Sequence, residues 1–236
     1  MSRSTIFSGV WIPIVTALRA GRVDHDALAA LVKRLAAAGA AGFVVCATTG
    51  EAPLLDDERV AVLGTVAAST ALPLVMGAAG TTAAEVLRRI DAAMRHAPAA
   101  FMVTPPPYLR PSQAALLAFF TAIADASPAP LVVYDIPART GVRLELDTLL
   151  ALAAHPRIVA LKDCGGRVGQ TEALIADGRL QVLCGNDDEW FSTRCLGGAG
   201  AIAASAHVRT DLFVAFDRAL ARGDLVAGRA LWRALK

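Results

Sequence analysis

The sequence predicts an α/β protein of the (β/α)8 class, a TIM barrel. Short apolar runs typical of buried strands alternate with longer amphipathic runs typical of helices, and eight such pairs recur at roughly 28-residue spacing. The length of 236 residues suits one such domain, because α/β barrels of roughly 200–250 residues fold as single units. A doubly wound open sheet is the alternative for an alternating chain.

The predicted elements follow one another from residue 7 to residue 222. The expected strands are 7–15, 42–46, 73–76, 99–103, 131–134, 158–161, 180–184 and 200–203. The expected helices are 24–38, 56–69, 82–96, 112–126, 144–154, 167–176, about 188–196 and 210–222. Asp24 and Ser112 are expected as N-caps and Gly39 as a C-cap. The acidic run 56–58 suits the positive end of the second helix dipole.

The composition argues against several classes of protein. The net charge is +2 without a basic block, which gives nucleic-acid binding little support. Hydrophobic residues make up 55% of the chain, but glycine and proline interrupt the longest uncharged run, 60–84, so we expect no membrane span. No charged segment followed by an apolar one stands at the N-terminus, so no signal peptide is expected.

The cysteines and histidines indicate neither a disulfide framework nor a metal site. The four cysteines lack C-x-x-C spacing and lie in or beside apolar stretches, which is typical of small buried residues in a reducing compartment. The four histidines are scattered without metal-ligand spacing, and no P-loop or G-x-G-x-x-G segment occurs. We therefore expect a cytoplasmic protein without a metal.

Lys162 is the candidate nucleophile. It follows the apolar run 158–161 and precedes the turn at Gly165. A buried ammonium is costly unless it is paired or loses its proton, and a desolvated amine is nucleophilic near neutral pH. The chain has only two other lysines, Lys33 and Lys236, so the candidates for a Schiff base are few. A strand-end lysine that simply reaches solvent is the alternative.

Further candidates stand where the predicted strands end. A TIM barrel carries its functional residues at the C-terminal ends of its strands, so these side chains are expected to share one rim. Together they offer an amine, hydroxyl groups that carry protons, and a cation for an anionic substrate. Taken singly, each could be ordinary turn chemistry or a solvated charge. The candidates are Thr48, Thr49, Gly50, Tyr108, Tyr134, Arg139, Lys162 and Gly185.

These residues resemble a known family, that of the pyruvate-dependent class I aldolases dihydrodipicolinate synthase (4-hydroxy-tetrahydrodipicolinate synthase) and N-acetylneuraminate lyase. The resemblance runs from about residue 7 to the end. It rests on a T-T-G-E segment at 48–51, a Y-x-x-P-x-R-T-G block at 134–141, the lysine at 162, Gly-Asn-Asp at 185–187 and the segment 197–205. The combination is specific, although each piece alone is not.

The resemblance implies where the domains lie. Residues 1–222 would form the catalytic barrel, and 223–236 would begin a C-terminal helical region that continues about 60 residues further in the family. We therefore expect the usual helical extension to be mostly missing.

The resemblance also implies roles for the rim residues. Lys162 would form an imine with pyruvate, so that no metal and no separate cofactor are needed. Tyr134 would shuttle protons, linked through Thr48 to Tyr108, which in the family reaches into a neighbouring subunit's site. A homo-oligomer, dimer or tetramer, is therefore expected.

Further residues would hold the two substrates, pyruvate and a small aldehyde. Thr49 and the backbone at Gly50 would bind the pyruvate carboxylate, and Gly185 and Ile202 would complete the site. Arg139 stands where the synthase binds the carboxylate of aspartate semialdehyde, a position at which the sialic acid lyases usually lack arginine. A guanidinium clamp on a carboxylate is physically sensible.

The favoured function is thus that of a synthase-like lyase, which condenses pyruvate with L-aspartate 4-semialdehyde in lysine and diaminopimelate biosynthesis. Another pyruvate-dependent aldolase or dehydratase, N-acetylneuraminate lyase-like or acting on another keto acid, is an alternative. A non-catalytic keto-acid-binding relative is a third hypothesis. Asp135 and His207 stand where the family commonly has asparagine, which keeps a related aldolase or dehydratase open. No histidine follows Glu51, where regulated synthases often carry lysine-binding histidines, so we expect weak or absent feedback inhibition by lysine.

Overall fold

The chain folds into a closed barrel of parallel strands. The structure is a computed structural model that describes residues 7–55 and 58–236. Within these residues the barrel order is β1-β10-β9-β8-β7-β6-β5-β4, and β1 pairs in parallel with both β10 and β4. The strands are β1 (Gly9–Pro13), β4 (Gly42–Val45), β5 (Leu74–Gly77), β6 (Ala100–Val103), β7 (Leu131–Asp135), β8 (Ile158–Asp163), β9 (Gln181–Cys184) and β10 (Gly200–Ile202). The predicted (β/α)8 barrel is confirmed, and the open doubly wound sheet is wrong.

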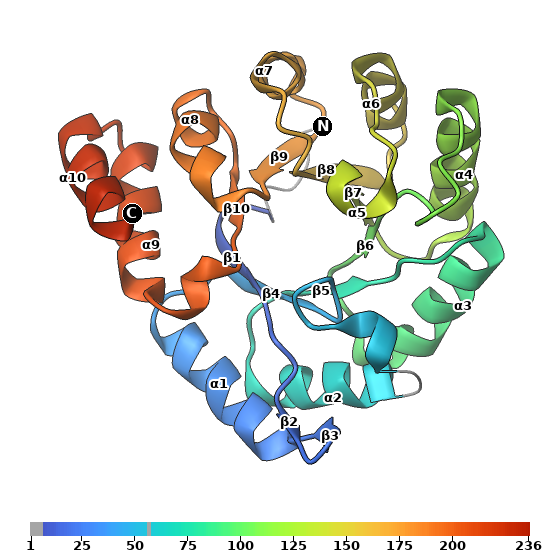
Figure 1. Cartoon of the computed structure of the whole chain (residues 1–236), viewed down its shortest axis with the longest axis horizontal. Coiled ribbons are helices and arrows are strands. Elements are labelled where there is room, and N and C mark those ends of the chain that lie inside the picture. Colours follow the sequence, from blue (N-terminus) through green and yellow to red (C-terminus); the bar gives the residue numbers. More distant parts are fainter. Residues whose placement is uncertain (1–6, 56–57) are drawn as a thin grey trace.

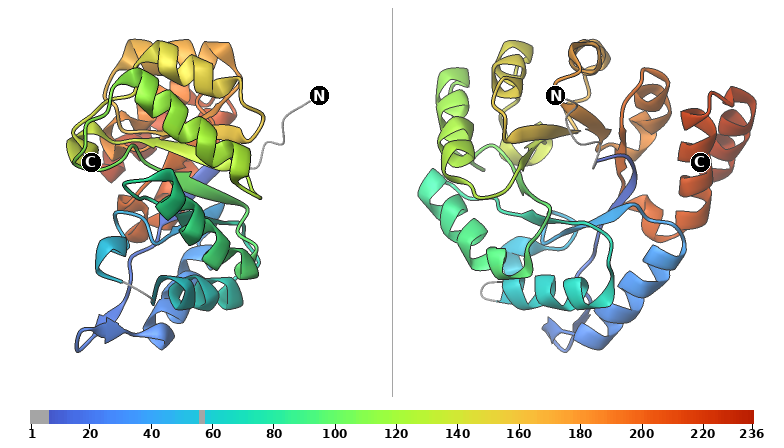
Figure 2. Two further views of the ribbon diagram at one scale, coloured as in Figure 1. Left: turned by 90° about the vertical axis from the view of Figure 1, so that its right-hand side faces the viewer. Right: turned by 180° about the vertical axis from the view of Figure 1, so that it is seen from behind.

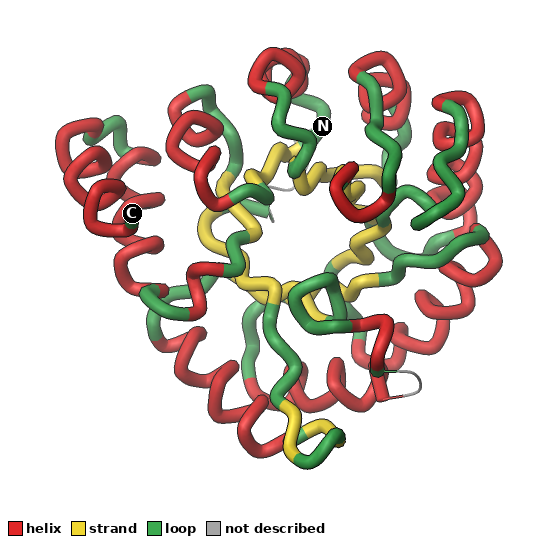
Figure 3. Tube along the Cα trace, viewed as in Figure 1, coloured by secondary structure: helices red, strands yellow, loops and turns green. Residues whose placement is uncertain are grey.

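Helices surround the ring of strands (Figure 1, Figure 3), and the view from behind in Figure 2 shows the same arrangement. They follow their strands as α1 (His25–Ala37), α2 (Arg59–Ser69), α3 (Ala83–Ala93), α4 (Gln113–Ala126), α6 (Leu146–Ala153), α7 (Val168–Asp177), α8 (Trp190–Cys195) and α9 (Thr210–Ala221). Each predicted helix corresponds to one of these helices, with ends that differ by a few residues at most.

Short elements that the sequence pattern does not predict decorate the loops, because they are too brief to show a hydrophobic period. They are the hairpin β2 (Leu18–Arg19) and β3 (Arg22–Val23), the helix α5 (Pro137–Thr140), and the 3-10 helices η1 (Ala52–Leu54), η3 (Met94–His96), η4 (Asp187–Glu189) and η5 (Ser205–His207). Several of them lie on the loops that carry the site.

The two predicted N-caps are confirmed, whereas the predicted C-cap at Gly39 is wrong by one residue, because Ala38 is the C-cap of α1. The Asp24 carboxylate accepts a hydrogen bond from the Ala27 N–H, and the Ser112 hydroxyl accepts one from the Ala115 N–H. Gly39 follows that C-cap with φ +99°, in the left-handed region that favours glycine. In the acidic run 56–58, positions 56 and 57 lie outside the described residues.

The barrel interior is filled by side chains. Alternate residues of the strands point inward, and together with Phe7 they form a core separate from the layer between strands and helices. Its members include Trp11, Val44, Val75, Met102, Val132, Tyr134, Ala160, Leu183 and Ile202. Since this core closes the middle of the barrel, any substrate must bind above it at the mouth.

Residues beyond α9 form one further helix, α10 (Leu225–Leu235), which packs outside α9 (Figure 1). The Trp232 ring stacks on Phe216 of α9 with centroids 5.1 Å apart. The predicted division of the chain at residue 222 stays a prediction, because α10 packs directly on the barrel's last helix. None of the helices in the described part of the chain is long and apolar enough to cross a membrane.

Gly77 at the end of β5 provides a test of barrel packing. A Cβ there would lie 2.2 Å from the Cys46 carbonyl oxygen, so backbone must move. We expect Gly77→Ala to lower the free energy of unfolding by about 3 kcal/mol. Gly169 in α7 has open space where a Cβ would stand, and Gly169→Ala should raise stability by up to about 1 kcal/mol. Urea denaturation measures the free energy of unfolding of both variants. Equal changes in the two variants would contradict the close packing at Gly77.

Candidate active site

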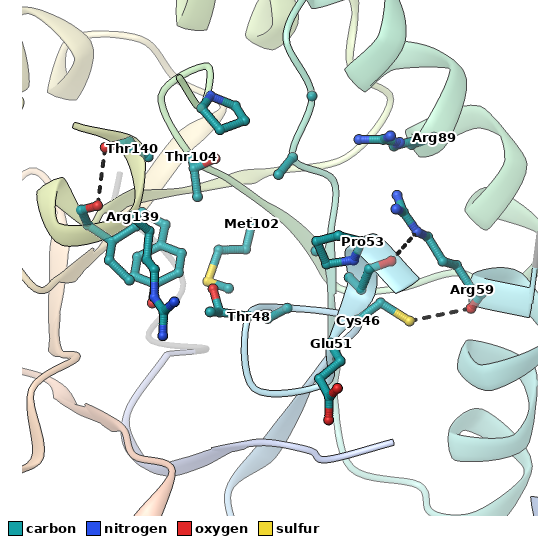
Figure 4. A pocket seen from close by; sticks show the side chains of 18 of the residues that line it. Cys46, Thr48, Glu51, Pro53, Arg59, Arg89, Met102, Thr104, Arg139 and Thr140 are labelled. Atoms are coloured by element: carbon teal, nitrogen blue, oxygen red, sulfur yellow. Dashed lines mark hydrogen bonds between the residues drawn. The ribbon is translucent and has the colours of Figure 1, made fainter. Parts of the chain in front are cut away.

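A cavity of about 640 Å³ opens at the C-terminal ends of β4 to β7 (Figure 4). Its walls include Thr48 from the loop after β4, Met102 and Thr104 from β6 and its loop, and Tyr134 and Arg139 from β7 and α5. Three predicted site residues therefore line one cavity, Thr48, Tyr134 and Arg139. The remaining predicted residues lie outside its walls, and several of them belong to the β8 to β10 side of the same mouth.

Lys162 lies inside β8, one residue before its end, and not after the strand as the apolar run suggested. The parallel pairing of β7 with β8 extends that far, matching Tyr134 with Lys162 and Asp135 with Asp163. Only 4% of Lys162 is exposed. Burial lowers the pKa of its amine, while the nearby Cys164, Asp187 and Cys184 act in the opposite direction. The alternative of a lysine that simply reaches solvent is therefore wrong.

Tyr134 is the neighbour of the amine. The Lys162 Nζ lies 4.3 Å from the centroid of the Tyr134 ring. Burial raises the pKa of the phenol above its ordinary value, as does the charge of Cys164, while a hydrogen bond with the Thr48 side chain lowers it. The phenol therefore keeps its proton at physiological pH and can donate it.

The loop after β4 holds the three residues Thr48, Thr49 and Gly50 in a tight turn. Thr48 is exposed to the cavity, Thr49 is half-buried and Gly50 is buried. The Thr16 hydroxyl donates to the Gly50 carbonyl at 2.7 Å, and a Cβ on Gly50 would lie 2.9 Å from the Ile14 carbonyl oxygen. The end of β1 thus fixes this turn against the barrel mouth.

Arg139 stands on α5, the short helix that follows β7. Its side chain is exposed and lines the cavity, and its charge acts to lower the pKa of Tyr134 (Figure 4). The helix is held by the Thr140 hydroxyl, which donates to the carbonyls of Ile136 and Val142. Gly141 ends it with φ +73°.

Gly185 lies close to the end of the Lys162 side chain, and Ile202 lies in the core of the barrel. A Cβ on Gly185 would lie 3.0 Å from Lys162 Cε and 2.3 Å from Cys164 Sγ, so no larger residue fits beside the lysine. Ile202 is 1% exposed and belongs to the core that fills the barrel. Their predicted part in substrate binding stays a prediction.

Tyr108 does not join the other residues within one chain. It is 90% exposed and adopts φ +73°, a left-handed conformation that costs a bulky residue of the order of 1 kcal/mol. Arg110, two residues later, also has a positive φ, +47°. The proline-rich loop therefore projects Tyr108 away from its own barrel.

Two side chains near the amine escaped sequence reasoning as individual site residues. Cys164 reads as a small buried residue, yet it interacts with both Lys162 and Tyr134. Asp187 stood out only as part of a Gly-Asn-Asp segment. Its carboxylate accepts from the Ser205 N–H at 2.9 Å, and its charge favours the protonated amine. The position of Cys164 two residues after the lysine was the available signal.

Behind the site lies a buried acidic pair, Asp135 and Asp163, on the two strands that carry Tyr134 and Lys162. Burial raises the pKa of Asp135 to about 6, and the neighbouring Asp163 adds to the effect. Asp163 accepts hydrogen bonds from the Thr171 hydroxyl at 2.6 Å and from the Gly165 N–H at 2.8 Å. These bonds join the end of β8 to α7 and to its own loop.

The fold and these side chains define a class. A buried amine with a lowered pKa lies against a protonated phenol at the mouth of a (β/α)8 barrel, which is the arrangement of an enzyme that forms a Schiff base with a carbonyl substrate. No cluster of possible metal ligands occurs among the described residues.

Comparison with known proteins gives the family. The model of the dihydrodipicolinate synthetase family matches residues 6–235, so the chain belongs to that family. It is 38% identical to the 4-hydroxy-tetrahydrodipicolinate synthase of Hyphomonas neptunium over 237 residues, 98% of this chain and 81% of that protein. The resemblance found in the sequence is confirmed.

Solved structures of dihydrodipicolinate synthases are also similar to this chain. Dihydrodipicolinate synthase from Acinetobacter baumannii, chloride-inhibited and complexed with pyruvate, superposes with a TM-score of 0.91 at 29% identity, covering 96% of this chain and 79% of that one. A structure described as the first monomeric dihydrodipicolinate synthase variant has a TM-score of 0.93 at 27% identity, covering 98% and 80%.

Lys162→Met is expected to raise the free energy of unfolding at pH 7, because burial disfavours the charged amine. The folded pKa of Lys162 lies below the unfolded value of 10.5. Between those two values the unfolded wild-type chain binds more protons, so wild-type stability rises with pH there. The variant's stability advantage should therefore shrink in urea denaturation as the pH rises through that window toward 10.5. An advantage that stays constant up to pH 10.5 would contradict the lowered pKa.

Proposed function

We propose that this protein is a 4-hydroxy-tetrahydrodipicolinate synthase-like lyase, which condenses pyruvate with L-aspartate 4-semialdehyde on the route to diaminopimelate and lysine. The observation that carries the proposal is the burial of Lys162, with its lowered pKa, against Tyr134. Curated relatives bear the synthase name and confirm the function predicted from the sequence. Nothing in the site favours a sialic acid lyase or a non-catalytic relative.

The first step forms the imine. The neutral amine of Lys162 attacks the keto carbon of pyruvate, and the carbonyl oxygen takes up a proton to give a carbinolamine. Loss of that hydroxyl as water, with a proton from the Tyr134 phenol, leaves the imine. The raised pKa of Tyr134 suits this step, because burial favours the protonated phenol and, by lowering the pKa of Lys162, the neutral amine. Thr48, bonded to the phenol, can return the proton.

The second step makes the carbon–carbon bond. The protonated imine draws electrons from the adjacent methyl group, so a methyl proton can leave and an enamine forms. The enamine carbon attacks the aldehyde carbon of the second substrate, and the aldehyde oxygen takes up a proton. The amino group of that substrate can then displace Lys162 from the imine carbon, which closes a ring and frees the enzyme. This chemistry needs no cofactor beyond the covalent imine.

Two carboxylates need partners in this scheme. We assign the pyruvate carboxylate to the Thr49 side chain and the backbone at Gly50, which the contact with Thr16 holds in place. The carboxylate of the semialdehyde is assigned to Arg139, which lines the cavity opposite the barrel's β4 loop. Gly185 and Ile202 shape the floor beside and beneath the amine.

We further propose a homo-oligomer, dimer or tetramer, in which Tyr108 completes the site of a neighbouring subunit. Its 90% exposure and left-handed φ support this, since such strain persists where function requires it. A similar solved structure described as monomeric shows that the fold itself does not require a partner. Cytoplasmic location is supported by the four cysteines, all of them free thiols.

Borohydride reduction in the presence of pyruvate tests the imine. Mass spectrometry of the digested wild-type protein should show a reduced pyruvate adduct on Lys162, and Lys162→Ala should show none. Absence of any adduct from the wild-type protein would overturn the proposed chemistry.

Replacing Arg139 distinguishes the reaction with pyruvate from the binding of the semialdehyde. Arg139→Ala should form the adduct normally, while kcat/KM for L-aspartate 4-semialdehyde falls by roughly a hundredfold, because a charged hydrogen-bonding partner is lost. Arg139→Lys keeps the charge without the planar fork and should fall in between. Unchanged semialdehyde turnover in Arg139→Ala would remove the reason to prefer this substrate.

Mixing inactive subunits tests the role of Tyr108. If Tyr108 acts in a neighbouring site, equal amounts of Tyr108→Phe and Lys162→Ala subunits, unfolded and refolded together, should recover roughly a quarter of wild-type activity. A mixture of Tyr134→Phe and Lys162→Ala provides the control, because both residues lie in one chain, and it should stay inactive. No recovery in the first mixture would place Tyr108 outside the neighbouring site.

A further inference from the structure

Cys164 lies in the turn directly after β8, two residues beyond Lys162. Its N–H donates to the Asp135 carbonyl at 2.9 Å, which ties the turn to β7. If Gly185 carried a Cβ, that atom would lie 2.3 Å from Cys164 Sγ and 3.0 Å from Lys162 Cε. The thiol and the end of the lysine side chain therefore flank the same small space.

The same thiol reaches the phenol. Cys164 and Tyr134 form a side-chain hydrogen bond, and Tyr134 has a second one with Thr48. The Lys162 amine lies over the ring of this tyrosine. The phenol oxygen is thus held from two sides, by a hydroxyl at the cavity and by a thiol on the lysine's own strand.

Burial raises the pKa of the Cys164 thiol to about 11, so the group is S–H at physiological pH. The sulfur of a neutral thiol is a weak hydrogen-bond acceptor and does not compete with the amine as a nucleophile. Any contribution of Cys164 to the reaction must therefore act through the Tyr134 phenol, with which the thiol forms a hydrogen bond.

We propose that Cys164 is a positioning residue of the reaction, whose sulfur accepts a hydrogen bond from the Tyr134 O–H while the Thr48 hydroxyl donates to the phenol oxygen. The proposal rests on the proposed function. A phenol that accepts from one neighbour and donates to the other has a single orientation, and its oxygen stays beside the imine carbon and the methyl group. The thiol gains and loses no bond in the reaction; it orients the group through which protons pass.

Exchange of the pyruvate methyl protons in D2O, followed by proton NMR without aldehyde, measures the proton transfer that forms the enamine. Cys164→Ala should slow this exchange about tenfold, the effect of one hydrogen bond, with KM for pyruvate little changed. Cys164→Ser keeps an acceptor for the phenol O–H and should restore the rate to within about threefold of wild type. Cys195→Ala, the same change at an exposed cysteine on α8, is the matched control and should exchange at the wild-type rate.

A purely packing role predicts a different pattern, because serine is nearly as small as alanine. An equally slow serine variant, or an alanine variant at the wild-type rate, would overturn the proposal. In a Tyr134→Phe background, Cys164→Ala should cause no further loss, whereas a further tenfold loss would also overturn it. If the alanine variant does not fold, Cys164→Val, which keeps the volume without an acceptor for the phenol O–H, carries the same expectation.

Borohydride trapping in each variant separates this inference from the function on which it rests. A Lys162 adduct in all variants with unaltered exchange rates would remove the role of Cys164 alone. A wild-type protein without the adduct would remove the proposed function itself.

Discussion

Burial of the Lys162 amine is the constraint on which the rest of the site depends. An amine in water holds its proton at neutral pH, and only desolvation makes it a nucleophile there. The barrel achieves this by placing the lysine inside β8, where 4% of it is exposed, against the face of a tyrosine on β7. The same burial raises the pKa of Tyr134, so one environment sets both protonation states that imine formation needs.

The fold around Lys162 offsets the free-energy cost of burying its amine. Side chains seal the barrel interior beneath the mouth, and the Lys162 amine lies over the ring of Tyr134, which lines the cavity. Backbone strain gathers at the open end. Among the described residues, positive φ outside glycine occurs at six positions, and four of them, Cys46, Glu51, Tyr108 and Arg110, lie on loops at the barrel mouth. Such strain is expected where backbone must aim a functional group.

Much of the fold and part of the site could be predicted from the sequence, because the evidence for them is local. Apolar period and capping residues such as Asp24 mark the elements, and eight alternating pairs imply a barrel. The strand-end positions of Thr48, Tyr134 and Arg139 imply one rim, and the cavity brings these three together. The sequence placed the end of β8 too early. Its last two residues, Lys162 and Asp163, are polar, and only their pairing with β7 shows that they belong to the strand.

The sequence by itself determined the class of fold and the family, and it singled out Lys162 as the candidate nucleophile, because lysine is rare in this chain and its motif is specific. Tertiary structure alone decided which neighbours tune that lysine. Cys164 and Asp187 act on it from different loops, and Tyr134 faces it across a strand pair. The pKa of a buried group depends on distances and on exclusion of water, which arise only when segments far apart in the chain are packed together. Tyr108 is exposed and adopts a left-handed conformation, and the role proposed for it depends in the same way on contacts, here with a second chain.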